Sequence, residues 1–88
     1  MMQKELTVQN RLGLHARPAA LVVSEASKFR SEIHLSKDDV EINAKSIMGV
    51  MMLAAEKGSR ILVTACGEDE QQAVEAIEAL FASKFDED

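Results

Sequence analysis

The sequence has no tryptophan, no tyrosine, one cysteine and one proline among its 88 residues. The lone cysteine, Cys66, excludes an internal disulfide and does not indicate a metal site, so we expect a reducing, cytoplasmic location. No apolar run approaches the length of a membrane span, and residues 1–5 contain no signal-peptide core. Gly-rich phosphate loops, clustered metal ligands and paired carboxylates are absent too. Membrane insertion and metal-dependent chemistry are therefore not expected.

Aromatic side chains are scarce, and their positions argue against nucleic-acid recognition. The three phenylalanines, Phe29, Phe81 and Phe85, fall in segments with helical periodicity, whereas an RNA-recognition sheet carries aromatics on its open face. The net charge of −5 also opposes binding to a polyanion. An α+β domain that binds nucleic acid or another ligand, and carries a histidine by chance, is thus a disfavoured hypothesis.

Size and composition predict one small globular domain over residues 1–88. Apolar residues make up 47% of the chain and charged residues 28%, which is typical of a folded protein rather than a disordered one. A chain of this length buries only about 60–65% of its unfolded surface. A deep cavity for a large cofactor would take up most of so thin a core. These limits disfavour a self-contained oxidoreductase or kinase.

The charges are unevenly distributed along the chain. Residues 1–60 contain nine basic and seven acidic residues, whereas residues 61–88 contain one basic and eight acidic residues. Residues 6–24 contain no acid, and Arg11, His15 and Arg17 lie within this window. An anion would meet less repulsion here than elsewhere on the chain.

Apolar and polar residues alternate in three short segments, which predicts β-strands. The first strand contains Leu6 and Val8, and two more form a hairpin over residues 33–42. A fourth, more buried strand is expected over residues 60–65.

Helical spacing of apolar residues predicts three helices between these strands. The first covers residues 16–29 and the second residues 46–56, ending at the Lys57-Gly58 stop signal. The third follows Asp69, with Gln72 completing a capping box. The order β-α-β-β-α-β-α indicates a two-layer α+β domain with a largely antiparallel sheet and one sheet face left to solvent.

Several other polar residues have ordinary structural explanations. His34 alternates with buried strand positions and is expected to face solvent, while Cys66 ends a strand and is expected to pack. Acidic residues 68–70 suit the start of the third helix, and residues 86–88 read as a solvated tail.

The segment GLHARPA at residues 13–19 connects the first strand to the first helix. Gly13 permits a tight turn, and His15 falls at or just before the first helical residue. The free N–H groups of the first turn, from Ala16 onward, and the Arg17 guanidinium could hold a phosphoryl group carried on the imidazole. The positive helix end also favours a neutral, nucleophilic ring. The alternative is a histidine that merely occupies a helix start.

A second segment, KSIMGVM at residues 45–51, opens the second helix. Ser46 is well placed as an N-cap, and a cap alone would explain it. The alternative is a regulatory phosphorylation site, since a phosphate is tolerated at a helix N-terminus and changes the local surface charge.

The residues after Ser46 are apolar on all sides of the predicted helix. One side fills the core, so the other is expected to expose residues such as Ile47, Met48 and Met51. Flexible methionines on an exposed patch are typical of a surface that meets several partners. The alternative is a short helix buried on most sides.

These two segments together resemble the HPr family, the histidine-containing phosphocarriers of the bacterial phosphoenolpyruvate-dependent sugar phosphotransferase system. The resemblance covers the whole chain in length, element order and the spacing of both motifs. It implies an open-faced β-sandwich with a four-stranded antiparallel sheet in the order 1-4-2-3 and three helices on one face. It also makes His15 the functional residue.

The resemblance further implies partners and roles. Enzyme I passes a phosphoryl group to Nδ1 of His15, and the carrier donates it to a sugar-specific enzyme IIA. Arg17 matches the family's phosphate-steadying arginine, and Ser46 matches the serine modified by an ATP-dependent HPr kinase/phosphorylase. The serine-phosphorylated form serves as corepressor for a catabolite-control transcription factor in some bacteria. Ile47, Met48 and Met51 match the partner-docking surface. Such a carrier is a monomeric protein substrate rather than an enzyme and needs no cofactor.

The sequence departs from the family's pattern at four positions, Ser24, Ser27, Met52 and Ala54, which bear on partner preference. A family paralogue keeps the serine but replaces the histidine with glutamine, and His15 argues against that identity. A regulatory module that acts through Ser46 and a transcription factor, without sugar transport, is the alternative function.

Overall fold

A computed structural model describes residues 1–87. Their helices and strands follow the predicted order, and the bounds are β1 (Met2–Thr7), α1 (Ala16–Ala26), β2 (Glu32–Lys37), β3 (Val40–Asn43), α2 (Ile47–Met52), β4 (Arg60–Cys66), α3 (Glu70–Ala82) and the short turn η1 (Lys84–Asp86).

The four strands form one antiparallel sheet in the order β1-β4-β2-β3, as the family resemblance implied. Leu6 pairs with Ile61 and Leu35 with Val63, so the apolar residues of neighbouring strands share one face. These four side chains are buried, whereas Leu62 on the other face is exposed. The predicted hairpin is confirmed, with β2 and β3 joined at Asp38 and Asp39.

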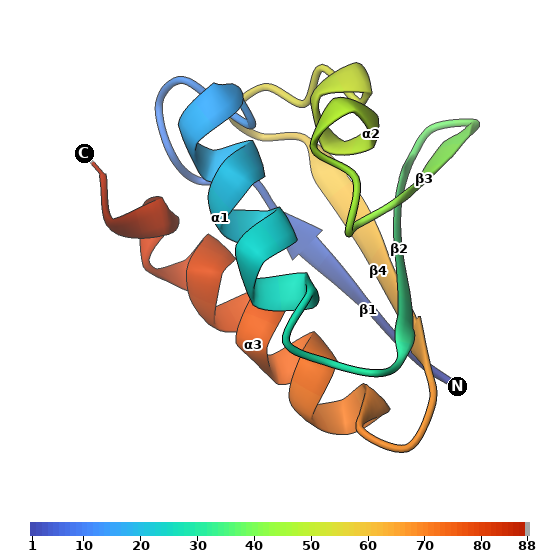
Figure 1. The fold of residues 1–88 in the computed structure, drawn as a ribbon. Coiled ribbons are helices and arrows are strands. Elements are labelled where there is room, and N and C mark those ends of the chain that lie inside the picture. The colour runs from blue at the N-terminus through green and yellow to red at the C-terminus, as the bar shows by residue number, and fades with distance from the viewer. Residues whose placement is uncertain (88) are drawn as a thin grey trace.

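The three helices lie on one side of the sheet, with α1 and α3 crossing in front of the strands and α2 beside the start of α1 (Figure 1). Their apolar stripes meet the buried face of the sheet. The core side chains contributed by the helices are Pro18, Ala19, Val22, Ala26, Val50, Ala73, Val74, Ile77 and Phe81. The opposite sheet face carries no helix among residues 1–87, which makes this the open-faced two-layer α+β fold.

The first helix ends earlier than its apolar spacing predicts. Residue 29 is the expected end, but α1 stops at Ala26. Beyond it the chain tightens into a turn in which the N–H groups of Lys28 and Phe29 bond to carbonyls three residues back. The Lys45 ammonium then donates to the Phe29 carbonyl at 2.7 Å. A side chain from a distant segment therefore supplies the hydrogen-bond donor that the last carbonyl of this turn lacks.

The second helix is also shorter than predicted, ending at Met52 rather than residue 56. Ala54 adopts a left-handed backbone with φ 49°, which breaks the helix one residue after its C-cap. The carbonyl of Ala55 then accepts a hydrogen bond from the Leu14 N–H at 2.9 Å. The segment after α2 therefore contacts the loop that precedes α1 through this hydrogen bond.

β4 has more buried residues than the other strands, as expected. Two predictions near the start of α3 were wrong. Cys66, at the end of β4, is exposed rather than packed. Asp69 forms no side-chain cap to its own helix, so the capping box with Gln72 is not formed. Its carboxylate instead accepts bonds from the N–H groups of Arg30 and Ser31 and from the Ser31 hydroxyl.

Two structural absences apply to residues 1–87. No helix there is long and apolar enough to span a membrane. No group of three His, Cys, Asp or Glu side chains in the same range is arranged to hold a metal ion.

Candidate functional site

His15 is the N-cap of α1, as the sequence predicted. Its backbone is extended, and its carbonyl accepts the first helical bond from the Ala19 N–H at 2.9 Å. The loop before it turns at Gly13, where φ is 71° and a Cβ would overlap the carbonyl of Ala55. Glycine is therefore required there both by the backbone angle and by the close approach of the segment after α2.

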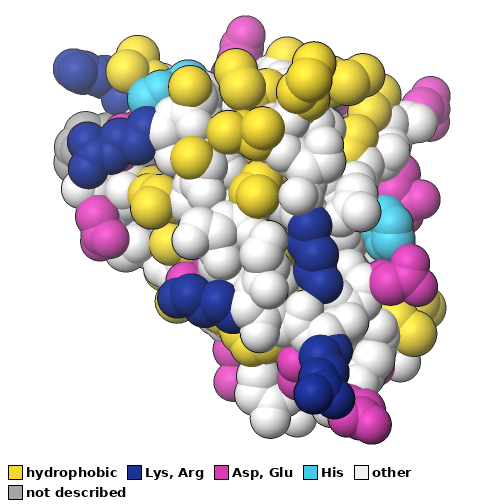
Figure 2. Space-filling model, viewed as in Figure 1, with side chains coloured by type: hydrophobic (Ala, Val, Ile, Leu, Met, Phe, Trp, Pro, Cys, Tyr) yellow, Lys and Arg dark blue, Asp and Glu magenta, His cyan; other side chains and the backbone are white. Residues whose placement is uncertain are grey.

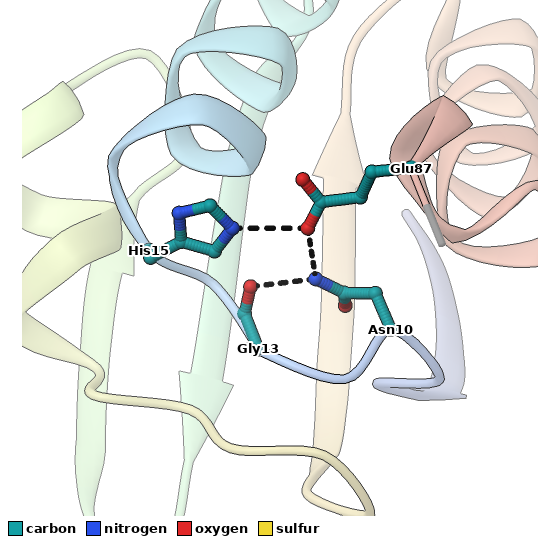
Figure 3. Close-up of polar contacts among 4 residues, drawn as sticks. All are labelled: Asn10, Gly13, His15 and Glu87. Atoms are coloured by element: carbon teal, nitrogen blue, oxygen red, sulfur yellow. Dashed lines mark hydrogen bonds and ion pairs between the residues drawn. The ribbon is translucent and has the colours of Figure 1, made fainter.

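The imidazole of His15 is held by a residue from the other end of the described chain. Its Nε2 lies 2.9 Å from Oε1 of Glu87, and the same oxygen accepts a bond from Nδ2 of Asn10 at 2.9 Å (Figure 3). Asn10 also donates to the Gly13 carbonyl at 2.8 Å. Both partners of the Asn10 amide are acceptors, which fixes its NH₂ toward them.

These contacts determine which ring nitrogen is free. The hydrogen bonds from His15 and then Asn10 lower the pKa of Glu87, so its carboxyl group is ionised near neutral pH and acts only as an acceptor. The Nε2 atom of His15 must then be the donor. In the neutral ring Nδ1 carries the lone pair, so Nδ1 is the nitrogen available as a nucleophile.

Glu87 reaches the ring because η1 turns the chain back toward the loop before α1 (Figure 1). Lys84, Phe85 and Asp86 all have left-handed backbones, with φ between 55° and 58°. Such a conformation costs about 1–2 kcal/mol per non-glycine residue. Phe85 is fully buried with its ring centroid 5.1 Å from that of Phe81, and this packing stabilises the turn.

The prediction that residues 86–88 form a solvated tail was therefore wrong for Glu87. Its side chain is 17% exposed and bonded to two residues, whereas Asp86 is exposed as expected. Asp88 lies outside the described residues.

Ala16 and Arg17 are the first two residues of α1. Their N–H groups have no acceptor within the helix, and Pro18, the third residue, has no N–H to offer. The Arg17 side chain is exposed, and its charge contributes to the lowered pKa of Glu87. Two backbone donors and one guanidinium therefore lie at the end of the helix that carries His15.

Ser46 is the N-cap of α2, as predicted, and its hydroxyl oxygen accepts a bond from the Gly49 N–H at 3.1 Å. The residue is exposed. Lys45, its neighbour, is engaged with the Phe29 carbonyl.

The exposed side of α2 is apolar, so the alternative of a helix buried on most sides was wrong. Met48 and Met52 are 73% and 69% exposed, and Ile47 and Met51 nearly half exposed. Leu12, in the loop before His15, is 66% exposed. Figure 2 shows hydrophobic side chains gathered over α2, beside a histidine and Lys or Arg side chains near the start of α1. We call Ile47, Met48, Met51 and Met52 the apolar surface.

Sequence reasoning missed Asn10 and Glu87, the residues that hold the His15 ring in place. Asn10 is fully buried. Its position in the acid-free segment, three residues before Gly13, was only a weak indication that it belongs to the site. Glu87 gave none, because its contact with His15 spans 72 residues. The second histidine and the cysteine lie outside the site. His34 is half-buried in β2, and Cys66 ends β4.

Comparison with known proteins identifies the family. Residues 2–83 match the family model described as the PTS HPr component phosphorylation site. Phosphocarrier protein HPr of Xylella fastidiosa is 53% identical over 88 residues, covering all of this chain and 99% of that protein. HPr-like protein Crh of Bacillus subtilis is 49% identical over 79 residues, covering 90% and 93%. The crystal structure of HPr-C-His from Thermoanaerobacter tengcongensis superimposes with a TM-score of 0.96 at 46% identity, covering 100% of this chain and 99% of that one. The chain belongs to the HPr family of phosphocarrier proteins.

Proposed function

We propose that His15 accepts a phosphoryl group on Nδ1 from phospho-enzyme I and donates it to a sugar-specific enzyme IIA. The observation that carries this proposal is the His15–Glu87 contact, which occupies Nε2 and leaves Nδ1 with the lone pair. The transferred phosphoryl group lies next to the N–H groups of Ala16 and Arg17 and the Arg17 guanidinium, all suited to phosphate oxygens.

The chain acts in this proposal as a protein substrate in a phosphoryl relay rather than as an enzyme, and it takes no cofactor. Residues 1–88 form one domain that works as a cytoplasmic monomer. Support comes from the site itself, since a single copy supplies His15, Asn10, Arg17 and Glu87.

The apolar surface beside His15 receives the partners. Ile47, Met48 and Met51 contact both enzyme I and enzyme IIA in this proposal, because each partner must bring a phosphorylatable residue to the same imidazole. Flexible thioether side chains suit a surface that meets differently shaped partners.

Ser46 is proposed as a regulatory site, phosphorylated by an ATP-dependent HPr kinase/phosphorylase. Its hydroxyl is exposed at the start of α2, and the residues that follow it form the apolar surface. A phosphate there adds negative charge to a surface that partners must desolvate, which weakens their docking. The phosphoserine form is also the one that would bind a catabolite-control transcription factor.

A second candidate is a regulatory module that works through Ser46 and a transcription factor without carrying phosphoryl groups to sugars. The similarity to the HPr-like protein Crh favours it. The presence of His15, in a setting that frees Nδ1, favours the phosphocarrier.

Intact mass after incubation with phosphoenolpyruvate, magnesium and enzyme I tests the proposal. The phosphocarrier gains one phosphoryl group that is lost in acid, survives alkali and is absent from His15→Ala. Absence of uptake, with Ser46 still labelled by ATP and HPr kinase, would contradict it and support the regulatory module. Ser46→Ala is the matched control, since it leaves His15 intact.

A further inference from the structure

We infer that Glu87 is a positioning residue for phosphoryl transfer, and that Asn10 and the η1 turn hold it in place against His15. The inference rests on the proposed function and adds to it a residue 72 positions away in the sequence.

The Glu87 carboxylate is held by two side chains, those of His15 and Asn10. The Glu87 side chain is only 17% exposed, and its Oε1 accepts from His15 Nε2 and Asn10 Nδ2, both at 2.9 Å (Figure 3). Asn10 is fully buried and is itself anchored on the Gly13 carbonyl. The carboxylate therefore meets a rigid partner and cannot follow the imidazole if the ring rotates.

The backbone that presents Glu87 is also constrained. Three consecutive non-glycine residues, Lys84 to Asp86, are held in the left-handed region, and the buried Phe85 ring ties them to Phe81. Backbone strain of this kind persists only where the surrounding structure enforces it. Here it directs one carboxylate at one ring nitrogen.

The chemical consequence concerns the proton on Nε2. When the Nδ1 lone pair forms the new N–P bond, the P–N bond to the donor histidine of enzyme I breaks, and the donor nitrogen keeps that electron pair. The proton stays on Nε2, so the phosphorylated ring becomes cationic. The Glu87 carboxylate lies against this N–H, orients the ring beforehand and stabilises the charge that develops, as a carboxylate does for a catalytic imidazole.

Three variants separate this role from simple packing. Glu87→Ala removes the acceptor, Glu87→Gln keeps a neutral acceptor, and Asp86→Asn removes a neighbouring charge from the same turn. The readouts are the ¹⁵N chemical shifts of the His15 ring nitrogens, which report the tautomer, and the rate of phosphoryl transfer from phospho-enzyme I.

Glu87→Ala is expected to lower the Nε2–H tautomer fraction and to slow transfer about threefold to tenfold, the loss expected for one partly exposed hydrogen bond. Glu87→Gln should restore most of the tautomer signal and part of the rate, and Asp86→Asn should match the wild type. Ring shifts and rates in Glu87→Ala equal to those of the wild type would overturn the inference, as would equal slowing in Asp86→Asn. Failure of the proposed function is distinct, because the wild type itself would then take up no phosphoryl group.

Discussion

The hydroxyl oxygen of Ser46 accepts a hydrogen bond from the Gly49 N–H at 3.1 Å, so the atom that caps α2 is also the atom that a kinase would phosphorylate. The structural role of Ser46 and its proposed regulatory role therefore meet at one oxygen. They can be separated, because aspartate is as good an N-cap as serine but adds charge.

Replacing Ser46 with Ala is expected to lower the free energy of unfolding by about 1 kcal/mol, because the Gly49 N–H loses its acceptor. Ser46→Asp should keep most of this stability. It should nevertheless raise the KM for phosphoryl transfer from enzyme I severalfold, through the cost of desolvating a new charge beside the apolar surface. Urea unfolding and transfer kinetics measure the two effects. Unchanged kinetics in Ser46→Asp would show that Ser46 lies outside the docking interface.

Met48, 73% exposed, is the position where docking can be tested with little effect on the fold. Met48→Ala is expected to raise the KM for transfer about fivefold or more, the effect of losing roughly 1 kcal/mol or more of interface contact. The melting temperature should stay near that of the wild type. Leu62→Ala, on the open sheet face, is the matched control and should transfer normally. Equal KM values for the two variants would argue against docking on α2.

Asp69 ties the loop after α1 to the start of α3, and hydrogen bonds, first from the Ser31 hydroxyl and then from the Arg30 N–H, lower its pKa from 3.8 to about 2. A carboxylate whose pKa is lower in the folded state stabilises the fold above its unfolded pKa. That contribution is lost as the pH falls from about 4 toward 2. Asp69→Asn should therefore be less stable than the wild type at pH 5. The difference in urea midpoint between the two proteins should narrow at pH 2. A gap in urea midpoint that is the same at both pH values would refute this account.

Ala54 ends α2 with a left-handed backbone, φ 49°, at a position where helices usually have glycine. Ala54→Gly is expected to stabilise the protein by about 0.5–1 kcal/mol, because glycine adopts this conformation without a steric penalty. Ala20→Gly offers a contrasting control, since this exposed residue lies inside α1, where glycine should destabilise by a similar amount. A melting temperature lowered by Ala54→Gly would count against the strain assigned to residue 54.

The parts of the fold that follow from local periodicity could be predicted from the sequence. Leu6, Ile33 and Leu35 alternate with polar neighbours, and each lies on the buried sheet face. Helix ends were less predictable because distant segments set them. The second helix stops at Met52, where Ala54 turns left-handed and the Ala55 carbonyl beyond it accepts from the Leu14 N–H, a contact that no local pattern contains.

In the site, too, the residues placed by local sequence could be predicted and those placed by distant contacts could not. His15 and Ser46 could be identified as helix caps because capping depends on neighbouring residues. Glu87 could not, because its position depends on a left-handed turn without glycine and on the packing of Phe85. A charged tail is ordinarily solvated.

The central claim is that His15 carries the phosphoryl group on Nδ1. NMR of the ¹⁵N-labelled protein, phosphorylated by enzyme I and phosphoenolpyruvate, tests it through the phosphorus–nitrogen couplings of the imidazole. The account predicts coupling at Nδ1 of His15 and a proton retained on Nε2, facing Glu87. A phosphoryl group on Nε2, or on any other residue, would contradict it.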